Sequence, residues 1–136
     1  MMRVFLFFLF LIFFLLVSSG LICCKDTQTN PSSEIVFPNS KVSFSKQVGP
    51  LFQQKCTASP CHGGNIPAAG LNLEYPSFTA LMNHIPTLVV PRDTNCLLLE
   101  RLSGRLPQMP PPKFPQLNQN QINVVKIWIE EGATYN

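Results

Sequence analysis

Two cysteines and the histidine that follows them are the residues of this sequence best suited to specific chemistry. Four residues separate Cys56 from Cys61, and His62 comes directly after the second cysteine. The common motif for covalent haem attachment has the same order but only two residues between its cysteines. In that chemistry the thiols add across the haem vinyl groups and the imidazole binds the iron. The stretch therefore predicts a haem attachment site with a lengthened gap, and Gly63 and Gly64 would let the backbone pass close to a flat macrocycle.

The same residues also allow two arrangements without haem. Cys56 and Cys61 would form a local disulfide in a small exported domain. Together with His62 and Cys96 they would supply the four ligands of a tetrahedral zinc site. Cys96 lies in an apolar stretch, where cysteine usually packs as a small hydrophobic residue. We expect Cys96 to be buried, and both arrangements stay open at this point.

The N-terminal residues have the pattern of an export signal. A positive charge at Arg3 precedes an unbroken apolar run of 14 residues, 4–17. This run is shorter than the roughly 20 residues of a transmembrane helix and fits the apolar region of a signal peptide. Cys23 and Cys24 then follow in a stretch that resembles the lipid-attachment site of bacterial lipoproteins, where a small residue normally precedes the modified cysteine. We predict a signal peptide over 1–23 and a diacylated Cys24, with ordinary signal cleavage or an uncleaved anchor as alternatives.

The remaining chain is long enough for one domain. Residues 24–41 are polar and contain two prolines, which predicts a flexible tether, and residues 42–136 are predicted to form the domain. The net charge of +3 is too small to suggest binding to nucleic acid. The sequence shows no nucleophile paired with a base and no phosphate-binding loop, so we predict no catalytic residue and expect no enzyme.

Helical periodicity predicts an all-α domain. Thirteen prolines favour helices separated by long ordered loops, and no segment has the pattern of a strand. Three main helices are predicted over 44–56, 94–103 and 119–131, with N-caps at Ser43, Asp93 and Asn118. The first must kink or restart at Gly49-Pro50, and residues 75–84 allow a further short helix. The first has an apolar face (Phe44, Val48, Leu51, Phe52), and the third has one (Ile122, Val125, Trp128, Ile129) opposite a polar stripe (Gln119, Asn123, Lys126, Glu130).

Several short motifs follow one another along the second half of the chain. They are Val90-Pro91-Arg92-Asp93, Cys96-Leu97-Leu98, Met109-Pro110-Pro111, Leu117 with Ile122, and Trp128-Ile129-Glu130-Glu131-Gly132-Ala133. With the cysteine pair, their order resembles that of small bacterial class I c-type cytochrome domains. Three features depart from the pattern. Arg92 stands in place of the usual glycine and Cys96 in place of a small polar residue. The gap between Cys56 and Cys61 is four residues instead of two.

The resemblance implies a cytochrome c-like fold around one covalent haem c. Cys56 and Cys61 would be the thioether sites, His62 the proximal iron ligand, and Met109, 47 positions later, the distal ligand. Prolines around Met109 would hold its loop in an extended conformation, which helps a weak thioether ligand to stay bound. Met82 and His84 are the rival distal ligands, and His84 would give a haem with two histidines.

The function implied by this resemblance is the transfer of single electrons. The cofactor would do the chemistry, and the protein would set its potential and access. The chain would be exported and held by its lipid on a membrane, facing the periplasm or the cell exterior. Its partner would be a redox protein that the sequence does not identify.

Overall fold

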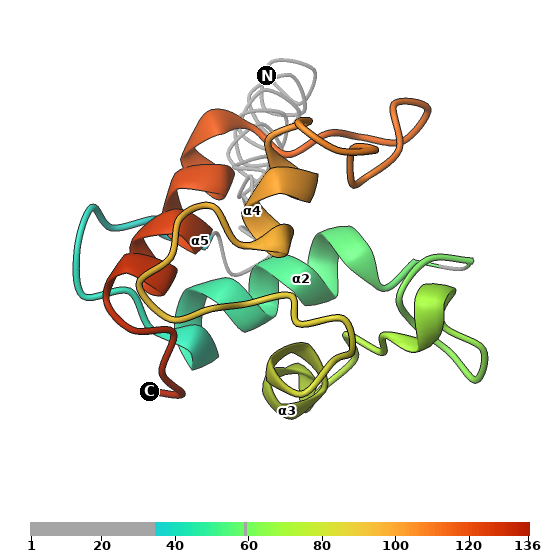
Figure 1. Ribbon diagram of the computed structural model, residues 1–136, viewed down its shortest axis with the longest axis horizontal. Helices are drawn as coiled ribbons and strands as arrows, with labels where there is room; N and C mark the ends of the chain where they lie inside the picture. The colour runs from blue at the N-terminus through green and yellow to red at the C-terminus, as the bar shows by residue number, and fades with distance from the viewer. Residues whose placement is uncertain (1–34, 59) are drawn as a thin grey trace, which may run out of the picture. The chain divides into compact units, whose positions relative to one another are not determined.

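The structure, a computed structural model, describes residues 35–58 and 60–136. Every regular element in these residues is helical and no strand forms in them, so the predicted all-α class is confirmed. Figure 1 shows two long loops, after α2 and after α4, that both extend past the C-terminal end of α2. The elements in chain order are η1 (Phe44–Val48), α2 (Gly49–Cys56), η2 (Ala68–Gly70), α3 (Ser77–Met82), α4 (Leu97–Leu102) and α5 (Gln119–Glu130).

The first predicted helix forms as two joined pieces. Its first turn, η1, is π-helical, and α2 restarts at Gly49 with Pro50 in its first turn, where a missing N–H group costs no hydrogen bond. Ser43 caps η1 by accepting a hydrogen bond from the amide of Lys46, as predicted. The predicted apolar face is buried at all four positions, Phe44, Val48, Leu51 and Phe52.

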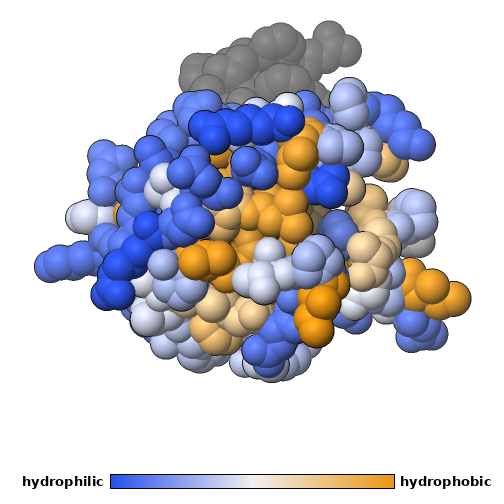
Figure 2. Space-filling view, in the orientation of Figure 1, coloured by the Kyte–Doolittle hydropathy of each residue, from blue (hydrophilic) through white to orange (hydrophobic). Residues whose placement is uncertain are grey.

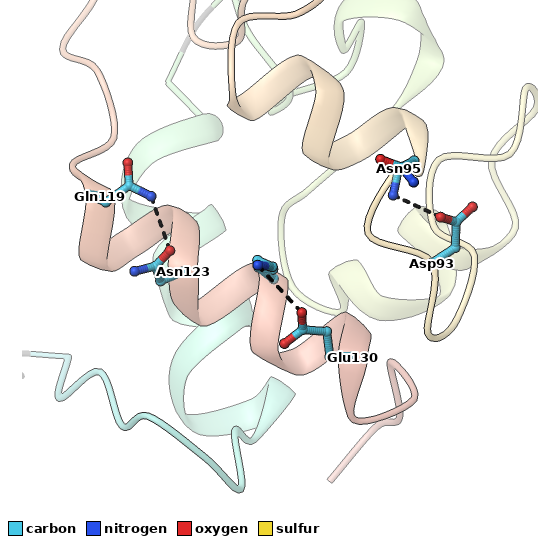
Figure 3. A network of polar contacts seen from close by, with 6 residues as sticks. Asp93, Asn95, Gln119, Asn123 and Glu130 are labelled. Carbon is cyan, nitrogen blue, oxygen red and sulfur yellow. Dashed lines mark hydrogen bonds and ion pairs between the residues drawn. The ribbon is translucent and has the colours of Figure 1, made fainter.

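Helix α5 also follows its sequence pattern closely. Asn118 and Gln121 form a reciprocal capping box, each side chain accepting a hydrogen bond from the other residue's backbone amide. Val124, Val125, Trp128 and Ile129 are buried, whereas the predicted face contained Ile122, which is half-buried, in place of Val124. The polar stripe is exposed as predicted, and Figure 3 shows its two contacts, Gln119 with Asn123 and the ion pair of Lys126 with Glu130.

The second predicted helix is shorter than expected. Helix α4 begins at Leu97, and its N-cap residue Cys96 makes no side-chain capping bond. The carboxylate of Asp93, predicted to cap this helix, instead accepts a hydrogen bond from the Asn95 amide at 2.8 Å in the turn before it (Figure 3). The prediction of a helix from Thr94 was therefore wrong by three residues. Arg92, in the same turn, has the left-handed φ of +65° that glycine adopts more easily.

The helices enclose one apolar core. Helix α5 contacts η1 and α4, and Trp128 packs near Phe44 and Phe78 with ring centroids 5.3 and 6.4 Å away. Ile35 and Phe37, within the predicted tether 24–41, are half-buried against this core. Helix α3 is the short helix that the sequence allowed within 75–84, so the described residues form four α-helices rather than three.

The export signal lies outside the described residues, as do its apolar run 4–17, Cys23 and Cys24. Within residues 35–58 and 60–136, none of the helices has the length and apolar character needed to cross a membrane.

The capping box gives a direct test of how α5 is held. Replacing Asn118 with alanine removes the acceptor for the Gln121 amide, and we expect the free energy of unfolding to fall by about 1 kcal/mol. Urea titration followed by circular dichroism measures this change. The matched control is Asn123→Ala, an exposed polar residue on the same helix, which should change stability by less than about 0.5 kcal/mol. Equal losses in the two variants would contradict a specific role for the cap.

Candidate functional site

Two adjoining cavities lie at the C-terminal end of α2, between the loop that follows α2 and the loop that follows α4. Their volumes are about 250 and 220 Å³. Four residues line both of them, namely Cys56, His62, Leu102 and Met109, so we treat the two as one crevice. Cys61 lines the larger part. All four residues that the sequence singled out as cofactor-binding, Cys56, Cys61, His62 and Met109, therefore meet at one crevice.

The walls of the crevice are mostly apolar. Leucine and proline are the commonest residues of the lining, with Phe52 in one part and Phe114 in the other. Figure 2 shows apolar surface gathered over α4. A crevice of this kind suits a large, flat and mainly apolar ligand, since ligand cavities of roughly 300–1,000 Å³ are typical and the two parts together fall in that range.

His62 is held by three hydrogen bonds. Its amide donates to the Cys56 carbonyl at 2.9 Å, and its own carbonyl accepts from the Leu73 amide at 2.7 Å. Its ring atom Nδ1 lies 3.2 Å from the Leu71 carbonyl oxygen, which can only accept, so Nδ1 carries the proton. The lone pair of the neutral ring is then on Nε2. This is the usual state of a histidine that binds a metal through Nε2 and is oriented by a backbone carbonyl at its other nitrogen.

The longer spacing between the cysteines leaves His62 beside the end of α2. The hydrogen bond from the His62 amide to Cys56 closes the loop at its base, and the Cys61 amide donates to the Ala58 carbonyl at 2.6 Å. Directly after α2, the Thr57 hydroxyl donates a hydrogen bond to the Gln53 carbonyl at 2.6 Å and so extends the end of this helix. The longer gap, which departs from the common motif, is accommodated without separating His62 from the end of α2.

Glycine is favoured at positions 63 and 64, directly after His62, for two different structural reasons. A Cβ atom at Gly63 would collide with the Thr57 carbonyl oxygen, so the close approach that requires glycine is to the chain's own backbone. Gly64 has a φ of +76°, a conformation that glycine adopts without strain. The sequence predicted that these residues approach a macrocycle, and the contacts within the chain already explain them.

Met109 is positioned by hydrogen bonds to α4. Its amide donates to the Arg101 carbonyl at 2.9 Å, and the Arg101 guanidinium donates to the Pro107 carbonyl at 3.1 Å. Further along the loop, the Gln116 side chain donates to the carbonyls of Pro111 and Phe114. The sequence attributed the order of this loop to its prolines alone, but these hydrogen bonds also fix it.

The rival distal ligands are placed differently. Met82 packs against the core and lines neither part of the crevice. His84 lines the smaller part, but its Nδ1 and Nε2 atoms lie 3.2 and 3.1 Å from the carbonyl oxygens of Pro86 and Ala69. Because both ring nitrogens already face acceptors, His84 has no free lone pair directed at a metal. The geometry favours Met109 over both.

The cysteines separate into two environments. Cys56 and Cys61 are half-buried free thiols at the crevice, and burial, followed by the charge of the neighbouring Cys61, raises the pKa of Cys56 to about 12. Cys96 is buried in the core, as expected, and lines neither part of the crevice. In the described part of the chain, no three His, Cys, Asp or Glu side chains lie close enough to hold a metal ion together, so the four zinc ligands considered from the sequence do not assemble.

Three cationic residues line the crevice, and the sequence reasoning missed all of them. Lys55 and Lys113 border the larger part and Arg101 the smaller, and no acidic side chain lines either. The signals were present, because Lys55 precedes the first cysteine and Lys113 lies in the proline-rich loop. The cations make the crevice suited to a ligand that is apolar over most of its surface and carries negative charge at an edge.

Comparisons with known proteins add no relative. No protein-family model, no curated protein and no solved structure matches this chain.

The buried thiol of Cys56 gives a prediction for the haem-free chain. With its pKa raised from 9.0 to about 12, the thiolate fraction of Cys56 at pH 8 is about a thousandfold lower than that of an ordinary cysteine. We therefore expect Cys56 to react with iodoacetamide far more slowly than a cysteine in the unfolded chain, as measured by peptide mass spectrometry. The Cys61→Ser variant removes the lesser cause, so Cys56 should stay slow. Rapid alkylation of Cys56 in folded protein would contradict its burial.

The same shift determines a pH dependence of stability. Folding favours the protonated thiol, so this contribution to the free energy of unfolding is fully present below pH 9 and is lost as the pH rises toward about 12. Denaturant titrations of the haem-free chain should show a smaller alkaline loss in Cys56→Ser than in the wild type.

Proposed function

We propose that this protein is a c-type cytochrome that carries single electrons through one haem covalently bound at Cys56 and Cys61. The observation that carries the proposal is the meeting of two thiols, an oriented imidazole and a thioether at one crevice. Cys56, His62 and Met109 line both parts of it, although Met109 is 47 positions from His62 in the sequence. Histidine and methionine are an established pair of axial ligands for haem iron in cytochromes c.

The residues of the crevice fit such a cofactor in three respects. His62 has its Nδ1–H group on a backbone carbonyl and its Nε2 lone pair free. The walls are apolar, as the faces of a porphyrin require, and Lys55, Arg101 and Lys113 are available to its carboxylates. Bound haem would supply the one-electron chemistry, and a methionine opposite the histidine favours a raised reduction potential.

The roles of the protein follow from its own contacts. The hydrogen bonds of His62 hold its ring in one orientation, and those of Met109 limit the freedom of a weak ligand to leave. Apolar walls restrict water around the iron site, which helps to set its potential. His62 and Met109 would be the two residues of this chain that hold the iron of a bound haem.

The cellular setting is part of the same proposal. Haem attachment to cysteines takes place outside the cytoplasm, which agrees with the export signal predicted over residues 1–23. A diacylated Cys24 would hold the domain at a membrane surface, facing the periplasm or the cell exterior, and the partner would be a redox protein. Two acyl chains anchor stably where one does so only marginally.

Covalent haem is the first test. Intact-mass measurement after denaturation should show one added haem in protein made by a host that matures c-type cytochromes. Cys56→Ser and Cys61→Ser should each lose one thioether bond, while Cys96→Ser, a buried cysteine outside the crevice, should keep both. A mass equal to that of the chain alone, with two hydrogens missing, would replace the haem proposal with a Cys56–Cys61 disulfide.

The distal ligand is tested by three alanine variants. Met109→Ala should lower the reduction potential and abolish the weak absorption band of ferric iron bound to sulfur. Met82→Ala and His84→Ala should keep that band, because Met82 packs against the core and both ring nitrogens of His84 face carbonyls. Loss of the band in Met82→Ala alone would show that Met82, and not Met109, is the distal ligand.

Lipid attachment is tested by metabolic labelling with a fatty acid. The wild type should incorporate the label, and Cys24→Ala should not. The matched variant Cys23→Ala should label normally. Label that persists in Cys24→Ala and disappears in Cys23→Ala would move the anchor to Cys23, and an unlabelled wild type would rule the anchor out.

A further inference from the structure

A second cavity lies along the first helical segment, Phe44–Cys56, and is lined by other residues than the crevice. It has a volume of about 450 Å³, is bordered by η1, the first turns of α2, the start of α3 and the C-terminal residues, and shares no lining residue with the crevice. In Figure 1 the chain's C-terminal residues lie beside the start of η1, and the two long loops that border the crevice lie beyond the opposite end of α2. The lining of this cavity extends along α2 to Gln53 and Gln54, which are next in sequence to Phe52 and Lys55 of the crevice, so the two sites use different residues of the same helix.

Aromatic rings form much of the wall of this cavity. Four of its lining residues are aromatic, namely Phe44, Tyr75, Phe78 and Tyr135, so we call it the aromatic cavity. Phe78 meets both Phe44 and Tyr135 edge to face, with centroid separations of 5.0 and 5.3 Å. These rings come from three separate segments of the chain. Tyr75, Tyr135 and the half-buried Phe78 are accessible to a flat ligand, while Phe44 is buried beneath them.

Tyr75 and Tyr135 are costly to leave in water. Their exposed fractions are 79% and 55%, although the domain has a packed aromatic core directly beside them. Tyr135 is held in place by its neighbour Asn136, whose backbone oxygen accepts hydrogen bonds from the Ser43 and Ser45 hydroxyls at 2.6 and 2.7 Å. A pre-positioned and exposed aromatic wall is characteristic of a binding surface rather than of a packing defect.

The polar groups of the aromatic cavity carry no formal charge. Besides its aromatic residues it is lined by serine, glutamine, glycine and proline residues, with no charged side chain. Tyr75 and Tyr135 both line the cavity, and the neighbouring Tyr75 hydroxyl raises the pKa of Tyr135 above its ordinary value. A phenolic hydroxyl can donate a hydrogen bond, so these two groups are available to an acceptor on a ligand. A charged ligand would lose hydration here without gaining a counter-ion.

We propose that the aromatic cavity is a binding site for an uncharged planar ring compound that carries a carbonyl group. Exposed aromatic rings of the wall stack on the ligand ring, and a hydroxyl of Tyr75 or Tyr135 donates to the carbonyl oxygen. Quinones and aromatic ketones belong to this chemical class. The site is independent of the crevice, so it stands whether or not haem is bound.

The test uses the full chain, as its host matures it, and three matched probes in isothermal titration calorimetry. 2-Acetylnaphthalene has the ring and the carbonyl, 2-ethylnaphthalene lacks the carbonyl, and 2-naphthoate carries a negative charge. We expect saturable one-to-one binding of 2-acetylnaphthalene, with about tenfold weaker binding of 2-ethylnaphthalene for one lost hydrogen bond. 2-Naphthoate should also bind at least tenfold more weakly than the ketone.

Variants assign the binding to the aromatic cavity. The double variant Tyr75→Phe with Tyr135→Phe keeps both rings and should bind the ketone as weakly as the wild type binds 2-ethylnaphthalene. Tyr135→Ala should weaken binding of the ketone at least tenfold, while Phe114→Ala, which removes an aromatic ring from the crevice, should leave the affinity unchanged. The double Tyr→Phe variant keeps both rings and should keep the wild-type unfolding midpoint in urea. Tyr135→Ala loses ring contacts with Phe44 and Phe78, so its midpoint should fall slightly, and binding is compared where each variant is fully folded.

Three results would each overturn the proposal. They are equal affinity of the wild type for all three probes, unsaturable binding of the ketone, and loss of binding in Phe114→Ala rather than in Tyr135→Ala. None of these results bears on haem attachment, which is measured separately by mass.

Discussion

The hydrogen bond from the His62 amide to the Cys56 carbonyl is the contact on which the geometry of the crevice depends. It closes the loop between the two cysteines at its base, so the residues within the loop do not set the position of the histidine. A loop with closed ends also loses less conformational freedom when a ligand binds at its base. The contacts of His62 with Leu71 and Leu73 then fix the ring and the following backbone. The end of α2 and the imidazole consequently behave as one rigid unit.

The opposite wall of the crevice depends on the core through α4. Leu98, Leu99 and Leu102 are buried, and α4 packs on α5, whose Trp128 lies near Phe44 of η1. Arg101 extends this order outward, since its carbonyl and its guanidinium both bind the loop that carries Met109. The packing that stabilises the fold therefore also places two distant parts of the sequence on facing sides of one crevice. An error in core packing would be expected to move Met109 relative to His62.

Much of the helical structure was readable from the sequence because its causes are local. The restart at Pro50, the capping box at Asn118 and the apolar faces of the first and last helices depend on residues within one or two turns of each other. The predicted N-cap at Asp93 was wrong because its carboxylate accepts a hydrogen bond from the amide of Asn95 in the preceding turn. The sequence pattern does not decide whether an aspartate accepts from a turn amide or from the first amides of a helix.

The site was predictable in its residue types but not in its supports. Cysteine, histidine and methionine in a familiar order indicated the four lining residues. The contact of His62 with the Leu71 carbonyl and the collision that makes Gly63 necessary arise from tertiary structure, which leaves no pattern in the sequence. The aromatic cavity is of the same kind, because Phe44, Tyr75 and Tyr135 lie far apart in the sequence.

Glu131 gives the domain a mechanical property. Glu131 directly follows α5, and its carboxylate oxygens accept hydrogen bonds from the backbone amides of Lys41 and Val42 at 2.6 and 2.8 Å. A pull transmitted along the chain from before Lys41 therefore meets this pair of charge-assisted bonds before it reaches η1. The load passes into α5, one of the best-packed helices, and is borne by the core. The crevice lies beyond η1 and α2 along the chain, so a force applied to the N-terminal side of the domain reaches the core before it reaches the residues that line the crevice.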